Sequence, residues 1–446
     1  MDPNSCGSCS ASVMLPNLEF GDNVIVPAIQ RLHDIDDVSV GKMVVNSLQY
    51  PYDEHSAVIL RFLLDSFVKT LEHDSSTETQ LQNQLTPNLI QPRFKTLITD
   101  FSAIISFGDS SLDVGNNDFL SRTVFKSNYP PYGRDFGDQK PTGRFCNGKL
   151  VGDITADSLG FTTYPRAYLS PQATGKNLLI GANFASAASG YDDKTAFLRH
   201  AISLSQQMRY FKEYQSKLAA VTGSTKAAFI IKEALYLACF GTADFLQNYY
   251  VNPKINKIYT PDQYSTYLVG KYSSFIKDLY GLGARRVGVT SLPPLGCLPA
   301  VKTFFGLHEK GCVSRINTVA QGFNKKLNLA TEKLKKQLPD LKITVFDIFN
   351  TLYDVILSPT TNGFLDASRG CCGTGAIPVS LFCNRKYSTG SCSNASEYVF
   401  WDGIHPTEIV NQVLLKHEIP LTQQIDYYKE YQPKLAAVAK VQKQHP

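Results

Sequence analysis

Short apolar segments alternate with longer amphipathic segments between residues 103 and 347, and this alternation limits the fold more than any other feature. The short segments predict five β-strands, at residues 103–107, 182–185, 235–240, 286–290 and 343–347. Apolar positions at helical spacing precede the last three strands and predict helices over residues 204–220, 263–282 and 316–337. Strands that alternate with helices are typical of βαβ units, so we expect an α/β fold with a central parallel sheet between two helical layers.

Composition excludes several classes of protein. Hydrophobic residues make up 43% of the 446 residues and charged residues 19%, a balance that excludes intrinsic disorder for most of the chain. No run of about 18 uncharged apolar residues occurs, so no membrane-spanning helix is expected. A net charge of +5, without a basic patch interleaved with aromatic residues, does not indicate nucleic-acid binding.

Both ends of the chain extend beyond the alternating region. Residues 1–100 show one amphipathic pattern, at 57–71, and we interpret them as an N-terminal extension of unassigned fold appended to a domain at 101–416. Residues 417–438 repeat residues 200–221 at about two-thirds of the positions, and two copies are too few for a repeat architecture. We therefore interpret residues 417–446 as a fragment of a related coding unit, an idea that a mature transcript read straight through them would contradict.

The ten cysteines give a mixed signal, and it is their clustering that favours an oxidising compartment. Cys371, Cys372, Cys383 and Cys392 crowd into one loop-like stretch and Cys297 and Cys312 bracket another, a pattern that favours disulfides over a zinc site because zinc-type spacing is absent. The lone Cys6-x-x-Cys9 pair is weak evidence for redox chemistry. Asn394, in Asn-Ala-Ser, is a candidate glycosylation site within the cysteine-rich stretch.

The first residues disagree with that compartment. They contain neither a basic segment nor an apolar segment of about 7–15 residues, so they do not resemble a signal peptide. We expect that the natural N-terminus is not the one that begins this sequence.

Two short motifs carry candidate chemistry. Ser110, in Gly-Asp-Ser, follows the first predicted strand, where its hydroxyl could serve as a nucleophile. Asp402 and His405, in Asp-Gly-Ile-His, lie three residues apart in a predicted turn, where the carboxylate could orient the imidazole. Each motif taken alone also fits a structural turn. Gly190 and the segment 241–244 follow two further predicted strands, so each could offer backbone or side-chain donors at the sheet edge where Ser110 lies.

In this order, the motifs resemble the plant-type GDSL esterase/lipase family of SGNH hydrolases. Matching segments include Asn183-Phe-Ala-Ser, Pro141-Thr-Gly-Arg-Phe, Leu292-Pro-Pro-Leu-Gly and Cys371-Cys-Gly-Thr-Gly, within about residues 101–415. The resemblance implies a flavodoxin-like α/β/α sandwich, usually secreted, that hydrolyses carboxylic esters without a metal or organic cofactor.

The resemblance also implies roles for single residues. Ser110 would be the nucleophile, His405 the general base and acid, and Asp402 its orienting partner. The oxyanion hole would comprise the backbone N–H groups of Ser110 and Gly190 and an Asn side chain, but Ala243 stands at the position of that Asn. Loss of one such donor typically costs about 10²–10³ in turnover.

Two functions follow from these residues. The first is a serine ester hydrolase that acts through an acyl-enzyme on Ser110, handicapped by Ala243. The alternative is a catalytically weak relative that binds esters or glycans. Short acyl esters, lipids and acylated cell-wall components all remain open as substrates, and the sequence does not indicate an oligomeric state.

Overall fold

A computed structural model describes residues 101–306, 309–373, 383 and 390–418. The predicted helix at 57–71, the Cys6-x-x-Cys9 pair and most of the second repeat copy lie outside these residues. The first repeat copy forms most of helix α8, Leu204–Thr222.

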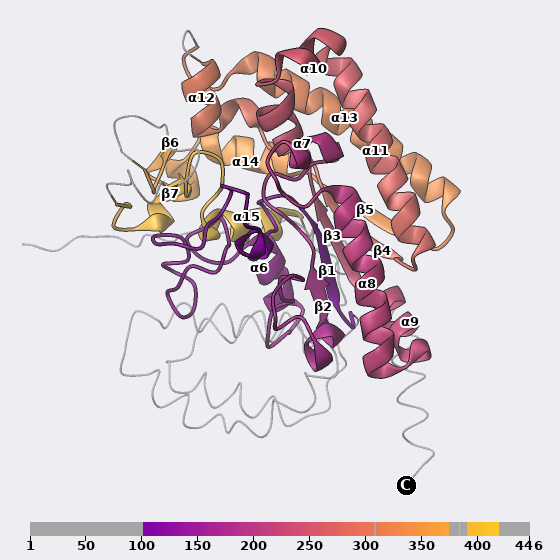
Figure 1. Cartoon of the computed structure of the whole chain (residues 1–446). Helices are drawn as coiled ribbons and strands as arrows, with labels where there is room; N and C mark the ends of the chain where they lie inside the picture. The colour runs from indigo at the N-terminus through magenta and orange to yellow at the C-terminus, as the bar shows by residue number, and fades with distance from the viewer. Residues whose placement is uncertain (1–100, 307–308, 374–382, 384–389, 419–446) are drawn as a thin grey trace, which may run out of the picture. The chain divides into compact units, whose positions relative to one another are not determined.

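A five-stranded parallel sheet forms the centre, as the alternating segments predict (Figure 1). Its strand order is β2-β1-β3-β4-β5, and all neighbours pair in parallel. The strands are β1 (Ile104–Gly108), β2 (Gly181–Asn183), β3 (Leu235–Cys239), β4 (Arg286–Thr290) and β5 (Lys342–Phe346). Each of the five was predicted to within two residues at either end.

Helices cover both faces of the sheet, which confirms the predicted α/β sandwich. On one face, Ile105 and Phe107 of β1 pack in a core with side chains of α8, α11 (Pro261–Gly281) and α13 (Ser314–Gln337). On the other face, Ile104 and Leu237 pack with Ala156 of α6 (Val151–Ser158), and α6 contacts α15 (Glu408–Glu418). The remaining α-helices are α7 (Asp193–Phe197), α9 (Ser224–Glu233), α10 (Pro253–Ile258), α12 (Pro299–Phe305) and α14 (Ile348–Leu357).

The three long helices were predicted from their apolar spacing, and capping residues explain their observed ends. Thr260 Oγ1 accepts from the Gln263 backbone N–H at 3.2 Å, so α11 begins two residues before the predicted start. Helix α8 continues to Thr222 and ends at Gly223, whose φ of 81° breaks the helical path.

A small second sheet was not predicted. Strands β6 (Asp366–Gly370) and β7 (Tyr398–Phe400) pair in parallel beside the cysteine-rich stretch. Disulfides join Cys371 to Cys392 and Cys372 to Cys383 there, and a third joins Cys297 to Cys312. These six cysteines are therefore disulfide-bonded and not zinc ligands.

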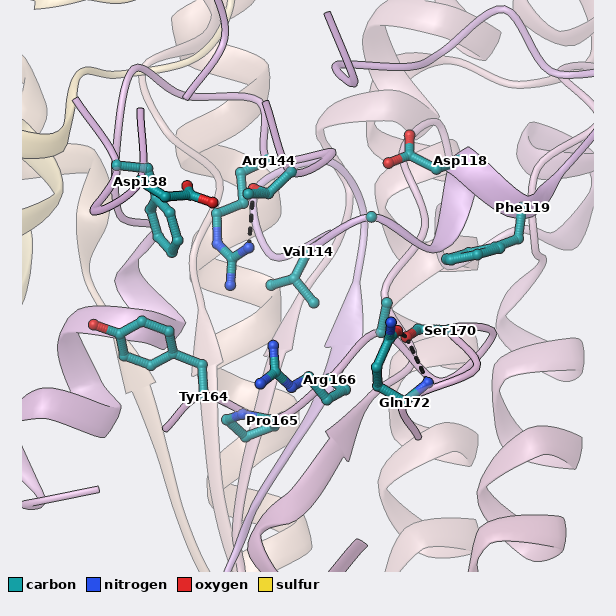
Figure 2. Close-up of a pocket in the computed structure, with 14 residues that line it drawn as sticks. Val114, Asp118, Phe119, Asp138, Arg144, Tyr164, Pro165, Arg166, Ser170 and Gln172 are labelled. Carbon is teal, nitrogen blue, oxygen red and sulfur yellow. Dashed lines mark hydrogen bonds between the residues drawn. The ribbon is translucent and has the colours of Figure 1, made fainter. Parts of the chain in front are cut away.

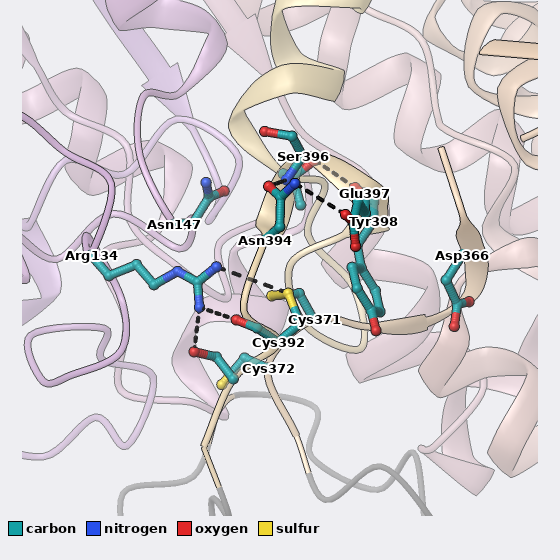
Figure 3. Close-up of a disulfide and its surroundings, with 12 residues drawn as sticks. Arg134, Asn147, Asp366, Cys371, Cys372, Cys392, Asn394, Ser396, Glu397 and Tyr398 are labelled. Atoms are coloured by element: carbon teal, nitrogen blue, oxygen red, sulfur yellow. Dashed lines mark hydrogen bonds between the residues drawn. A yellow bond between two sulfur atoms is a disulfide. The ribbon is translucent and has the colours of Figure 1, made fainter. Parts of the chain in front are cut away.

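The disulfide-bonded segment packs against the end of β7, which leads into the predicted Asp402–His405 turn. The Cys371 and Cys372 backbone N–H groups donate to the carbonyls of Phe400 and Trp401 at 2.9 and 2.7 Å. Figure 3 shows Arg134 reaching the Cys392 carbonyl from a distant part of the chain, beside the exposed Asn394. Among the described residues, no helix is both long and apolar enough to span a bilayer.

Candidate active site

Ser110 lies on a turn directly beyond the end of β1. Gly108, the last residue of that strand, packs so tightly on β3 that an added Cβ would lie 2.7 Å from the Cys239 carbonyl oxygen. The Asp109 backbone N–H then donates to the same carbonyl at 2.9 Å, and the Asp113 N–H donates back to the Asp109 carbonyl at 3.1 Å. The chain thus leaves the sheet at residue 109 and presents a half-buried Ser110 at the edge.

Asp402 and His405 form an Asx-type turn between β7 and α15. The backbone N–H groups of Ile404 and His405 each donate to Asp402 Oδ1 at 2.8 Å. The same carboxylate lies 2.9 Å from His405 Nδ1. The structural turn and the orienting contact were alternatives in the sequence, and here the turn is what creates the contact.

The structure brings the two motifs together across 295 residues of sequence. His405 Nε2 lies 2.7 Å from Ser110 Oγ. Asp402 and His405 are 0% and 3% exposed, so the hydrogen bond between them is shielded from water. When Nδ1 of a neutral imidazole donates to Asp402, Nε2 can accept the proton of the serine hydroxyl.

Tyr132 extends this arrangement, and sequence reasoning missed it. Its hydroxyl donates to Asp402 Oδ2 at 2.8 Å and accepts from the Cys383 backbone N–H at 3.1 Å. Burial, followed by the charge of Asp402, raises the pKa of Tyr132 well above its ordinary value, so the phenol remains a donor. Since Cys383 belongs to a disulfide, the cysteine-rich stretch is linked to the candidate catalytic triad of Ser110, His405 and Asp402.

Gly190 lies on the loop that follows β2, against Asp244. An added Cβ at Gly190 would lie 2.2 Å from Asp244 Oδ1, so only glycine allows this approach. Asp244 in turn accepts from the Tyr191 N–H at 2.7 Å and from Thr195 Oγ1 at 2.6 Å. Burial raises the pKa of Asp244 to about 7. The Gly190 loop and the segment after β3 are thereby joined.

Ala243 immediately precedes Asp244, at the start of a π-helix (Asp244–Tyr249). The side chain is 3% exposed, and its methyl group has no hydrogen-bond donor. Strand β3 pairs with β1, with Cys239 opposite Gly108. The segment that contains Ala243 therefore follows the strand next to β1, and Ser110 follows β1 itself. The expected side-chain donor is therefore missing.

Two buried carboxyl groups flank Ser110 in sequence. Asp109 is 1% exposed, its Oδ1 accepts from the Ser111 N–H at 3.0 Å, and its Oδ2 has no hydrogen-bond partner; burial raises its pKa to about 6. Asp113 accepts from the backbone N–H groups of Gly115, Asn116 and Ala187, and burial raises its pKa to about 7. Asp113 thus anchors the turn that carries Ser110 to the loop after β2.

A pocket of about 350 Å³ adjoins the continuation of this turn (Figure 2). The guanidinium groups of Arg144 and Arg166 point into the same space from opposite sides, beside Val114. A buried ion pair with Asp153, at 2.7 Å, holds Arg144 in place. The aromatic rings of Phe119, Phe136 and Tyr164 complete a lining that is both polar and apolar. In the part of the chain that the structure describes, no group of three or more His, Cys, Asp or Glu residues could hold a metal ion.

Comparison with known proteins relates the whole described region to one family. The family model described as GDSL-like Lipase/Acylhydrolase matches residues 104–417. The "GDSL esterase/lipase APG" of Arabidopsis thaliana is 61% identical over 330 residues, which are 74% of this chain and 92% of that protein. A second GDSL esterase/lipase of the same plant is 55% identical over 315 residues (70% and 86% of the two chains), and a third is 54% identical over 325 residues (72% and 91%).

Proposed function

The chain belongs to the GDSL-like lipase/acylhydrolase family and is a carboxylic ester hydrolase, and we propose that it cleaves esters through an acyl-enzyme on Ser110. The observation that carries this proposal is the continuous set of contacts from Ser110 Oγ through His405 to Asp402, at 2.7 and 2.9 Å. We assign the hydrolase domain to residues 101–416.

In the first half of the reaction, Ser110 Oγ attacks the ester carbonyl carbon while its proton moves to His405 Nε2. Asp402 stabilises the imidazolium that forms. The carbonyl oxygen becomes an oxyanion, for which the backbone N–H groups of Ser110 and Gly190 are the proposed donors. Collapse of this intermediate breaks the bond to the alcohol oxygen, which takes the proton from His405 and leaves an acyl group on Ser110.

In the second half, a water molecule replaces the alcohol. His405 Nε2 takes a proton from the water as its oxygen attacks the acyl carbon. The second tetrahedral intermediate then releases the carboxylic acid, and the proton returns to Ser110 Oγ.

A fluorophosphonate probe tests the nucleophile directly. We expect one covalent adduct, mapped by mass spectrometry to Ser110, together with loss of hydrolysis of a short p-nitrophenyl ester. Ser110→Ala is expected to abolish both the adduct and the hydrolysis of the ester. Ser111→Ala, at the adjacent serine, leaves the adduct in place. Labelling of another residue, or hydrolysis that survives in Ser110→Ala, would overturn the proposal.

Ala243 favours a second candidate function, a weakly catalytic protein that binds esters or glycans. The missing donor lowers the expected turnover without affecting the Ser110–His405 contact. Restoring the donor distinguishes the two functions, as described in the Discussion.

We also propose a substrate with a polar portion. The pocket beside the Ser110 turn, whose lining begins at Val114 and does not include Ser110 or His405, combines Arg144 and Arg166 with aromatic rings. Such a lining is better suited to a hydroxylated or charged group than to a long alkyl chain. Rates measured across a series of p-nitrophenyl esters and acylated sugars check this, since a steady rise in kcat/KM with alkyl length would contradict it.

The three disulfides support a proposed oxidising, secreted location for the protein. Glycosylation of the exposed Asn394 is part of the same proposal. Protein recovered from its natural tissue with these six cysteines as free thiols would contradict it.

A further inference from the structure

Gln207 is a buried polar residue on the core face of α8. The other residues buried along this helix are Leu204, Phe211, Tyr214 and Leu218, which are apolar or aromatic. Gln207 is 0% exposed. A side-chain amide at such a position is costly unless its donors and acceptor are all paired, so its partners indicate why it is there.

The Gln207 amide pairs with both polar groups of one glycine. Its Oε1 accepts from the Gly108 N–H at 3.0 Å, and its Nε2 donates to the Gly108 carbonyl at 2.9 Å. The same Nε2 also donates to Ser189 Oγ at 3.1 Å and, at the longer distance of 3.4 Å, to the Ile202 carbonyl. One side chain of α8 thus joins the end of β1, the loop after β2 and the segment that leads into α8.

These partners lie within two residues of the two proposed oxyanion donors. Gly108 lies two residues before Ser110, and Ser189 immediately precedes Gly190. We propose that Gln207 is a positioning residue that sets the spacing between the backbone N–H groups of Ser110 and Gly190. This inference rests on the function proposed above for those two groups.

The surrounding packing fixes Gly108, and Gln207 links this fixed point to the Gly190 loop. On the β3 side, Gly108 lies so close to the Cys239 carbonyl that even a Cβ would not fit. On the β2 side, Gly108 is tied to the following loop by the Ser186 N–H, which donates to its carbonyl at 3.0 Å. Gln207 adds the second tie and places it at residue 189, next to the donor itself. Because oxyanion donors act only within a few tenths of an ångström of their ideal distance, a small shift here lowers the rate.

Gln207→Glu tests the inference with nearly unchanged side-chain volume. A protonated glutamic acid retains one donor, whereas a carboxylate has none and faces the Gly108 carbonyl. We expect kcat for a short p-nitrophenyl ester to fall by about 10- to 100-fold with KM changed by less than about threefold. The ratio of the variant's kcat to that of the natural protein should rise as the pH is lowered, because the acid form restores a donor.

A tetrahedral inhibitor separates positioning from a general loss of structure. The Ki of a short alkylboronic acid, whose adduct on Ser110 places an oxygen in the oxyanion hole, should rise about as much as kcat falls. A merely structural role would reduce the fraction of sites titrated by the fluorophosphonate probe and leave kcat per titrated site and Ki unchanged. That result would overturn the inference.

Two further variants complete the experiment. Gln215→Glu removes an amide-to-carbonyl bond of 2.7 Å elsewhere on α8 and should leave kcat within about twofold. Ser189→Ala removes only the Gln207–Ser189 bond and should lower kcat per titrated site by several-fold, even if Gln207→Glu fails to fold. If Ser189→Ala has no effect while Ser110 remains the labelled nucleophile, this inference fails and the proposed function stands; if the natural protein is not labelled at Ser110, the proposed function itself fails.

Discussion

Replacing Tyr132 with phenylalanine removes one hydroxyl group from the support of the candidate triad. The ring is 1% exposed and packs against Phe145 and Trp401, with centroids 5.8 and 6.2 Å away, and these contacts remain. The lost bond to the Asp402 carboxylate contributes about 1.5–3 kcal/mol, and the orphaned Cys383 N–H costs about 1–3 kcal/mol. Since the two estimates partly overlap, we expect a decrease of about 2–4 kcal/mol in the free energy of unfolding.

The same change should lower the rate of hydrolysis. Without the phenol, the Asp402 carboxylate loses one of the donors that fix its position beside His405 Nδ1. We expect kcat to fall about tenfold or less, because two backbone N–H groups still hold the carboxylate.

Urea unfolding and kcat for p-nitrophenyl acetate hydrolysis measure the two effects. Tyr129→Phe is the matched control, since Tyr129 donates to the Cys383 carbonyl at 2.6 Å and its replacement leaves the bond to Asp402 intact. We expect the control to lower stability without lowering kcat. If the two variants lower kcat equally, or neither does, the argument that Tyr132 acts through Asp402 is wrong.

Three further predictions concern single residues. Ala243→Asn should raise kcat for a short p-nitrophenyl ester by about 10²–10³ if the missing donor limits the natural protein; a change below about threefold would mean that another group already supplies it. Gly190→Ala should lower kcat/KM at least about 100-fold, because its Cβ meets Asp244 at 2.2 Å, whereas Gly270→Ala, with open space at its Cβ, should not. Asp109 has a folded-state pKa raised from 3.8 to about 6, so the folded state binds more protons between those values and stability falls as the pH rises through them. Asp109→Asn should therefore be more stable than the natural protein at pH 7, by up to about 3 kcal/mol in urea unfolding, with the gap closing below about pH 4.

The central sheet was predictable because its signals are local. Residues 286–290 were predicted with the observed bounds of β4, since glycine before them and Ser-Leu-Pro-Pro after them mark the ends of the strand. The strand at Asp366–Gly370 was not predicted, because its sequence Asp-Ala-Ser-Arg-Gly has low β-propensity. That strand exists through its pairing with β7 and the adjacent disulfides, which no local pattern reveals.

The candidate site likewise contains residues that the sequence predicted and residues that it did not. Ser110 and the Asp402–His405 turn were found because each is a compact motif at a predicted strand end or turn. Tyr132 and Gln207 were missed because their contacts span 270 and 99 residues and depend on tertiary packing. For Gln207 a signal was present: it interrupts an otherwise apolar helical face, and such a position suggests a buried polar contact.

Three segments form the proposed oxyanion hole: the end of β1, the Gly190 loop and the segment after β3. The contacts that join them explain why alanine at residue 243 does not distort the site. Asp244, not the side chain of residue 243, ties the segment after β3 to the Gly190 loop, and Gln207 ties that loop to the end of β1. The backbone at residue 243 is therefore held by its neighbour and by β3, whichever side chain it carries. Replacing asparagine with alanine at that position removes a donor without removing a positioning contact. The expected handicap is accordingly that of one lost hydrogen bond to the oxyanion, which is why a single substitution at residue 243 should suffice to reverse it.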